Sequence, residues 1–362
     1  MQVPLIDLKA QYRTIRAEVR EAVDAVMENQ KFILADRVKE LEDEMARFCE
    51  TVHAIGCASG TDAVLLSLLA AGVRENDEVI TTAYSFFATA GMIAWIKAKP
   101  VFVDIDPLTF NMKMNEVKAA VSGRTKAVIA VHLFGQCARV EELEGLNIPV
   151  IEDACQSIGA SRYGRKAGSL GFTGCFSFFP TKNLGGCGDG GMITTGNTDT
   201  AVKLRQLRSH GQSSQYHHIS VGTNSRLDEL QAAVLCVKFR HLEEWNRKRA
   251  EHAKYYEEDL KSLPLRLPQV DPGNHSIHHQ FVILSEERDR LKAYLAEKGI
   301  GTAVYYPLPL PHQPCFSNLG FKQGQFPGAE LCAAQSLALP VYPEMSEQQL
   351  DYVTSTIRSF YY

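Results

Sequence analysis

The sequence lacks the features that mark a secreted, membrane-spanning or zinc-bound protein. Its nine cysteines include no C-x-x-C pair, so neither a disulfide framework nor a zinc site is favoured, and we expect reduced thiols. No apolar run approaches the roughly 18 residues that a membrane helix needs. Residues 1–9 lack the basic start and long apolar stretch of a secretion signal. We therefore expect a cytoplasmic protein with no membrane partner.

An excess of charge of one sign is also missing. The chain carries 38 Lys and Arg against 42 Asp and Glu, a net charge of −4, which gives no electrostatic reason to expect nucleic acid as a partner. No internal repeat or low-complexity segment is visible. A chain of 362 residues exceeds what one core usually supports. We expect a large domain over residues 1–245 and a smaller C-terminal domain over residues 246–362.

Strand-like and helix-like patterns alternate between about residues 54 and 210, and several of the strands are unbroken apolar runs. The predicted strands are 54–59, 78–82, 100–103, 126–131, 149–152, 174–179 and 191–195. This alternation predicts an α/β domain with a mostly parallel sheet covered by helices on both faces. A long helical stretch, 225–263, leads to a smaller α/β part with a strand at 280–284 and helices at 286–298 and 346–359.

A lysine and an aspartate at two predicted strand ends carry the main chemical signal. Lys182 follows the apolar run 175–179, and Asp153 ends another strand 29 positions upstream. A lysine amine can hold an aldehyde cofactor as a Schiff base and move protons, provided that part of it is unprotonated. An aspartate beside a pyridine nitrogen keeps that nitrogen protonated, so that the ring can accept electrons. The pair suggests a pyridoxal 5′-phosphate (PLP) site.

Taken alone, each of these residues has a simpler interpretation. An isolated lysine is usually a solvated surface cation, and an isolated aspartate is usually a turn or helix cap. The context favours a site because five of the seven residues between 185 and 191 are glycine, which frees the backbone for close approach to a ligand.

Other candidate cofactor contacts lie at further strand ends. Gly60 and Thr61 open a predicted helix directly after a strand, where amides and a hydroxyl can bind a phosphate. Ser177 lies five residues before Lys182 and supplies a second hydroxyl. Phe86 follows another strand and can lie flat on a pyridine ring. Alone, these residues would be a helix cap, a strand serine and a core phenylalanine.

Three histidines close together raise the question of a metal. His275, His278 and His279 precede a predicted strand and follow a Pro-Gly turn, so a helix that would align them is not expected. We predict no metal site.

Five stretches in order resemble the DegT/StrS family of PLP-dependent nucleotide-sugar aminotransferases, which have fold type I. They are residues 59–63 (SGTDA), 152–157 (EDACQS), 177–185 (SFFPTKNLG), 224–233 (NSRLDELQAA) and 299–302 (GIGT). The likeness runs from residue 6 to the last helix. It implies the fold type I architecture, a large domain with a mixed, mostly parallel sheet and a smaller C-terminal α/β domain.

The resemblance also implies roles for single residues. Lys182 would form the Schiff base and act as acid and base, and Asp153 would pair with the pyridine nitrogen. Gln156 would bond near the phenolic oxygen of the ring. The remaining cofactor contacts would be Phe86 on the ring and Gly60, Thr61, Ser177 and Asn224 on the phosphate. In the family the equivalent of Asn224 comes from the partner subunit, which implies a homodimer with shared sites.

The reaction implied by the resemblance moves an amino group from L-glutamate to a ketone of a nucleotide-linked hexose, with pyridoxamine 5′-phosphate as the intermediate form. The segment 224–229 (NSRLDE) favours C3 of the sugar, and C4 is the alternative. The nucleotide, dTDP or UDP, stays open. Lys182 disfavours the dehydratase subgroup, which has histidine at that position.

Three residues are candidates for contact with the sugar, namely His279, Tyr306 and His312. Two other interpretations remain. One is a PLP aminotransferase acting on a cyclitol ketone. The other is a binding or regulatory protein that keeps PLP or a sugar nucleotide as a ligand.

Overall fold

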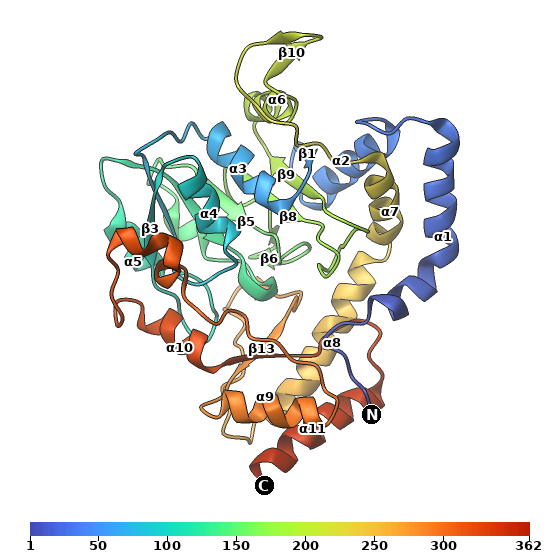
Figure 1. Cartoon of the computed structure of the whole chain (residues 1–362), viewed down its shortest axis with the longest axis vertical. Coiled ribbons are helices and arrows are strands. Elements are labelled where there is room, and N and C mark those ends of the chain that lie inside the picture. The colour runs from blue at the N-terminus through green and yellow to red at the C-terminus, as the bar shows by residue number, and fades with distance from the viewer.

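A seven-stranded mixed sheet forms the centre of the computed structural model, which describes all 362 residues (Figure 1). Its strand order is β1-β9-β8-β5-β4-β2-β3. Only β9 runs antiparallel to its neighbours, β1 and β8. The strands are β1 (His53–Cys57), β2 (Glu78–Thr82), β3 (Lys99–Val103), β4 (Thr125–Val131), β5 (Val150–Asp153), β8 (Thr173–Ser177) and β9 (Gly191–Thr195). The predicted α/β fold with a mostly parallel sheet is confirmed.

Both faces of the sheet are buried. Successive side chains of each strand point to opposite sides, so each face packs against its own layer of helices. In β4, Ile129 packs with Leu66 of α3 (Gly60–Ala70) on one face. Its neighbour Val128 packs with Val117 of α5 (Met114–Ala120) on the other. Strands buried on both faces are continuous apolar runs, which is why their positions could be predicted from the sequence.

The remaining helices surround this sheet and extend below it in Figure 1. They are α1 (Leu8–Asn29), α2 (Asp36–Phe48), α4 (Ala88–Trp95), α6 (Thr198–Leu207), α7 (Glu229–Phe239), α8 (Leu242–Leu260), α9 (Arg288–Glu297), α10 (Pro327–Gln335) and α11 (Glu347–Tyr361). No helix is both long enough and apolar enough to cross a membrane.

The long helix predicted over residues 225–263 is wrong in detail, because α7 and α8 are separate helices that meet at residues 240–241. The two have different environments. Most residues of α7 are buried, in the core shared with α1 and α2, whereas α8 is amphipathic and continues to the C-terminal part. The helical sequence pattern continues through residues 240–241, so the sequence alone does not reveal the break between α7 and α8.

The C-terminal part has its own core around the antiparallel pair β13 (Phe281–Leu284) and β14 (Ser336–Leu339). Tyr256 of α8 and Val3 from the start of the chain pack into it. The N-terminus accordingly lies close to this part in Figure 1. The predicted division between residues 245 and 246 falls inside α8, and its position stays a prediction.

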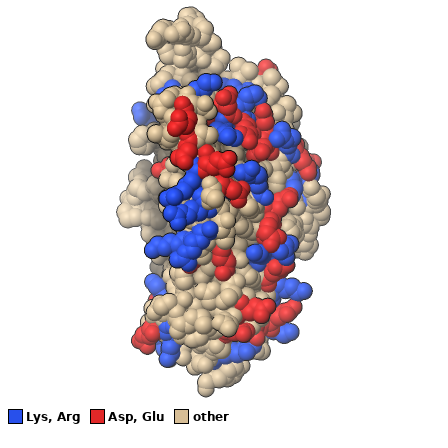
Figure 2. Space-filling view, turned by 90° about the vertical axis from the view of Figure 1, so that its right-hand side faces the viewer, with Lys and Arg blue, Asp and Glu red and all other residues tan.

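Small strands complete the fold. The hairpin of β10 (Gln212–Ser214) and β11 (His217–His218) projects from the body at the top of Figure 1. A three-stranded sheet joins β6 (Ser161–Arg162), β7 (Arg165–Lys166) and β12 (Asn274–His275). Figure 2 shows acidic and basic side chains interleaved over one face of the molecule.

Candidate functional site

Two strand ends and a helix start meet at one edge of the sheet. Asp153 ends β5 and Ser177 ends β8, and these strands run parallel side by side. Gly60 begins α3, and a Cβ added to it would lie 2.6 Å from Cβ of Ser177 and 2.8 Å from Sγ of Cys155. Only glycine permits this approach, so α3 starts directly against the ends of both strands.

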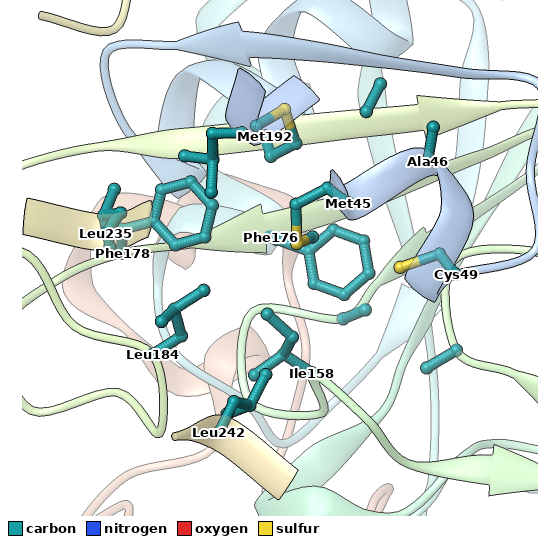
Figure 3. Packing of buried hydrophobic residues seen from close by; sticks show 14 of the residues in the cluster. Met45, Ala46, Cys49, Ile158, Phe176, Phe178, Leu184, Met192, Leu235 and Leu242 are labelled. Atoms are coloured by element: carbon teal, nitrogen blue, oxygen red, sulfur yellow. The ribbon is translucent and has the colours of Figure 1, made fainter. Parts of the chain in front are cut away.

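The loop that carries Lys182 is anchored at both ends in the core. Phe178 and Leu184 flank it, and both are fully buried in one cluster of apolar side chains (Figure 3). Within the loop, the Lys182 amide donates a hydrogen bond to the Phe179 carbonyl at 2.9 Å. These contacts fix the backbone from which the lysine side chain extends.

The environment of Lys182 favours a neutral amine. Burial lowers its pKa below the ordinary value of a lysine, and the neighbouring Cys155 and Asp153 offset part of this effect. The Asp153 carboxylate is itself only 7% exposed. A partly desolvated amine beside a carboxylate is an arrangement typical of a catalytic lysine.

The glycine run at 185–191 serves a different purpose from the one predicted. A Cβ on Gly185 would lie 2.3 Å from the Pro180 carbonyl oxygen, and one on Gly191 would lie 2.4 Å from the backbone of Ser59. The glycines therefore let the loop pack tightly against its own chain. The interpretation of this run as a surface for close approach to a ligand is not needed.

Asp153 is held by two hydrogen bonds, one to each carboxylate oxygen. The Thr89 hydroxyl of α4 donates to Oδ2 at 2.7 Å, and the Cys155 amide donates to Oδ1 at 3.3 Å. These two donors fix the plane of the carboxylate.

Gln156 and Tyr306 meet on the C-terminal side of this edge. The Gln156 Oε1 accepts from the Phe134 amide at 3.0 Å, and its Nε2 donates to the Tyr306 hydroxyl at 3.0 Å. Burial raises the pKa of Tyr306, so its hydroxyl stays protonated. The Phe86 ring lies 6.4 Å from the Tyr306 ring and is 56% exposed, so a planar ligand can reach it.

His279 is a buried member of a polar network beside the Lys182 loop. It is 5% exposed, and its Nδ1 lies 2.9 Å from Oδ1 of Asn183, the residue after Lys182. The Asn183 Nδ2 donates in turn to Asn246 of α8 at 2.7 Å. Burial holds the pKa of His279 well below its ordinary value. The imidazole is therefore neutral at physiological pH.

The other predicted sugar contact, His312, has a partner within its own chain. Its Nε2 lies 3.2 Å from Oε1 of Glu330 in α10, and its side chain is 18% exposed. The structure thus brings Tyr306 to Gln156 and His279 to the Lys182 loop, whereas His312 pairs with α10.

Asn224 and Thr61 lie on the outer side of the α3 start. Ser59 caps this helix by accepting from the Asp62 amide at 3.1 Å. The Ser225 hydroxyl donates to the Asp62 carboxylate at 2.7 Å. The adjacent Asn224 is exposed and Thr61 is half-buried.

Two residues that sequence reasoning missed complete the surroundings. They are Thr89, which contacts Asp153, and Tyr84, which contacts the backbone of Tyr305 and Tyr306. Both lie close to Phe86, directly after β2, and that proximity was the only signal available. No group of three or more His, Cys, Asp or Glu side chains in the structure could share a metal ion. All nine cysteines are free.

Comparison with known proteins places this arrangement in a family. The family model described as the DegT/DnrJ/EryC1/StrS aminotransferase family matches residues 13–358. The chain belongs to this family. As the sequence predicted, it is an aminotransferase, the activity that the description of the family names.

Similar members of the DegT/DnrJ/EryC1/StrS family carry names of two kinds. A protein from Geobacillus stearothermophilus named pleiotropic regulatory protein is 49% identical, over 100% of this chain and 99% of the relative. A UDP-N-acetyl-3-dehydro-alpha-D-glucosamine 3-aminotransferase from Acidithiobacillus ferrooxidans is 41% identical, over 98% and 97%. The crystal structure of S. venezuelae DesV in complex with a ketimine intermediate is 37% identical, with a TM-score of 0.97 over 99% of this chain and 98% of that one.

Proposed function

We propose that this protein is a PLP-dependent aminotransferase that moves an amino group from L-glutamate to the C3 ketone of a nucleotide-linked hexose. The observation that carries the proposal is the meeting of a desolvated Lys182 amine with the buried Asp153 carboxylate at one sheet edge. Membership of an aminotransferase family supports it.

The residues at this edge offer the chemical groups that would bind PLP. Lys182 offers an amine for the aldehyde, Asp153 offers an acceptor for a ring N–H, and Phe86 offers an exposed aromatic face. The start of α3 at Gly60 and the Ser177 hydroxyl offer donors for a phosphate. When bound, PLP supplies an aldehyde that carries the amino group and a ring that accepts electrons from a carbon losing its proton.

The chain's own residues then do the binding and the proton transfer. Lys182, whose pKa burial lowers, would take a proton from the α-carbon of glutamate and return one elsewhere. Thr89 and Cys155 donate to the Asp153 carboxylate and fix its orientation. Gln156, fixed through Oε1 by the Phe134 amide, directs its Nε2 hydrogens toward Tyr306 and the site.

We propose a homodimer in which Asn224 reaches the site of the partner subunit. The exposed position of Asn224 supports this, since its side chain is free to contact another subunit. Large apolar side chains nearby are also exposed, with Ile219 at 58% and Val221 at 93%. Apolar surface of this kind is typical of an interface.

The C3 position rests on the sequence segment 224–229 and on the name of the relative from A. ferrooxidans, which acts at C3 of a UDP sugar. The nucleotide of this protein's own substrate stays open between UDP and dTDP. A C4 ketone and a cyclitol ketone are the alternative acceptors. We assign sugar contact to Tyr306, with His279 and His312 as further candidates.

The test is a substrate panel. Protein loaded with pyridoxamine 5′-phosphate is incubated with UDP- and dTDP-linked 3-keto and 4-keto hexoses and with a free cyclitol ketone, and products are identified by mass and NMR. We expect an amine at C3 of one nucleotide sugar, and none with Lys182→Met as the control. Amination at C4 or of the cyclitol alone would overturn the assignment of substrate.

A regulatory role is the second candidate, because the relative at 49% identity is named a pleiotropic regulatory protein. The two functions differ in whether the cofactor turns over. Addition of glutamate to the PLP-loaded protein should shift its visible absorption and release 2-oxoglutarate if the protein is an aminotransferase. A regulator that only binds PLP would keep the spectrum and release nothing.

A further inference from the structure

Thr89 connects two parts of the site that are 64 residues apart in the chain. It lies in the first turn of α4 and is fully buried. Its hydroxyl donates a hydrogen bond of 2.7 Å to Oδ2 of Asp153 at the end of β5. This is a buried bond between a neutral donor and a carboxylate, a class stronger than bonds between two neutral groups.

The direction of this bond is fixed by chemistry. An ionised carboxylate only accepts, so the Thr89 hydroxyl must donate to it. The Ser85 hydroxyl lies 3.4 Å from Thr89 Oγ1 and can donate only to the lone pairs that remain. If the Thr89 hydroxyl rotated to donate to Ser85, Asp153 would lose one of its two hydrogen-bond donors.

The second carboxylate oxygen has a weaker bond, because the Cys155 amide approaches Oδ1 at 3.3 Å. Thr89 thus makes the shorter of the two bonds that orient the carboxylate. It also stands three residues after Phe86, the exposed ring of the same segment. Residues 86–89 therefore supply both the exposed ring of Phe86 and the hydroxyl that orients the Asp153 carboxylate.

We propose that Thr89 is a positioning residue for the transfer reaction, holding the Asp153 carboxylate in the orientation in which it meets the ring nitrogen of PLP. This inference rests on the proposed function, in which Asp153 contacts the cofactor. Thr89 touches neither substrate nor cofactor and acts through Asp153 alone.

The test compares Thr89→Val with Thr89→Ser. Valine keeps the shape of threonine and removes the hydroxyl, whereas serine keeps the hydroxyl and removes the methyl group. The affinity of the apoprotein for PLP is measured by fluorescence titration, and the protonation of the ring nitrogen is read by NMR with ¹⁵N-labelled PLP. We expect Thr89→Val to weaken PLP binding and lower kcat by about tenfold each, as for a lost bond to a charged group. Serine should restore both, and KM should change little.

A matched control is Thr81→Val in β2. Thr81 is also fully buried, and its hydroxyl donates to the Ile129 carbonyl at 3.2 Å, away from Asp153. This variant should lose stability without loss of PLP affinity. If Thr89→Val does not fold, Thr89→Ala replaces it in the same comparison with Thr89→Ser.

Two results would overturn the proposal. One is a Thr89→Val variant whose ring-nitrogen protonation is unchanged and whose PLP affinity and kcat lie within about twofold of wild type. The loss of a hydrogen bond to a charged group should instead change both by about tenfold. The other is a Thr89→Ser variant as impaired as Thr89→Val, which would assign the effect to packing of the methyl group. Failure of the proposed function is distinguishable, since the wild-type protein itself would then not transfer an amine.

Discussion

Nε2 of Gln156 donates a hydrogen bond to the hydroxyl of Tyr306 at 3.0 Å, joining residues 150 positions apart. The Tyr306 oxygen accepts this bond, so its own proton is left to donate elsewhere. The exposed Phe86 ring lies 6.4 Å from the Tyr306 ring, so Tyr306 borders the candidate cofactor site. Tyr306 is therefore poised to donate to a ligand.

Tyr306→Phe should lower kcat/KM for the sugar ketone by about tenfold, the usual effect of one lost hydrogen bond to a polar ligand. The half-reaction with glutamate should change less, if Tyr306 contacts the sugar. Stopped-flow measurement of each half-reaction separates the two. Equal losses in both would place Tyr306 on the cofactor rather than on the sugar.

Tyr84 holds the segment that presents Tyr306. Its hydroxyl donates to the Tyr305 carbonyl at 2.6 Å and accepts from the Tyr306 amide at 2.5 Å. In Tyr84→Phe, Ser336 can still donate to the Tyr305 carbonyl, but the Tyr306 amide loses its partner. We expect a loss of about 1–3 kcal/mol in the free energy of unfolding, measured with urea. A loss near zero would show that water replaces the tyrosine hydroxyl.

The desolvated amine of Lys182 makes the stability of the apoprotein depend on pH. Its pKa is lowered in the folded state, so between that value and 10.5 the unfolded chain binds more protons and wild-type stability rises with pH. Lys182→Met lacks this contribution. The variant should be more stable than wild type at neutral pH, and the difference should shrink toward pH 10, as followed by urea unfolding. A difference that is constant or grows with pH would contradict the lowered pKa.

Shared sites in a homodimer predict complementation. Lys182→Ala and Asn224→Asp remove the amine and place a repelling charge near the phosphate, so each variant alone should be inactive. In a dimer of the two, one site has Lys182 from one chain and Asn224 from the other. Random mixing by unfolding and refolding should restore about a quarter of wild-type activity. Refolding of each variant alone is the control, and no recovery in the mixture would place Asn224 outside the partner's site.

The sequence located the strands that end at Asp153 and Ser177 to within a few positions, because buried parallel strands are continuous apolar runs. The predicted strand 149–152 is β5 (Val150–Asp153), and 174–179 is β8 (Thr173–Ser177). Asp153 and Ser177 could be placed at one sheet edge because parallel strands end on the same side. The family resemblance supplied the rest of the predicted set.

What the sequence could not supply was contact between distant elements. The bond from Thr89 to Asp153 depends on how α4 packs against β5, and no periodicity encodes that packing. The glycines at 185–191 were read as room for a ligand, but they let the loop approach Pro180 and Ser59. A glycine-rich composition indicates that the backbone lies close to other atoms, and only the fold shows which atoms those are.

The central claim is that the amine of Lys182 is the covalent attachment point of PLP. Borohydride reduction of the PLP-loaded protein, followed by proteolysis and peptide mass spectrometry, tests it most directly. The account predicts a reduced pyridoxyl group on the peptide that contains Lys182, and no such label in Lys182→Met treated in parallel. A wild-type protein that carries the label on another lysine, or no label at all, would contradict it.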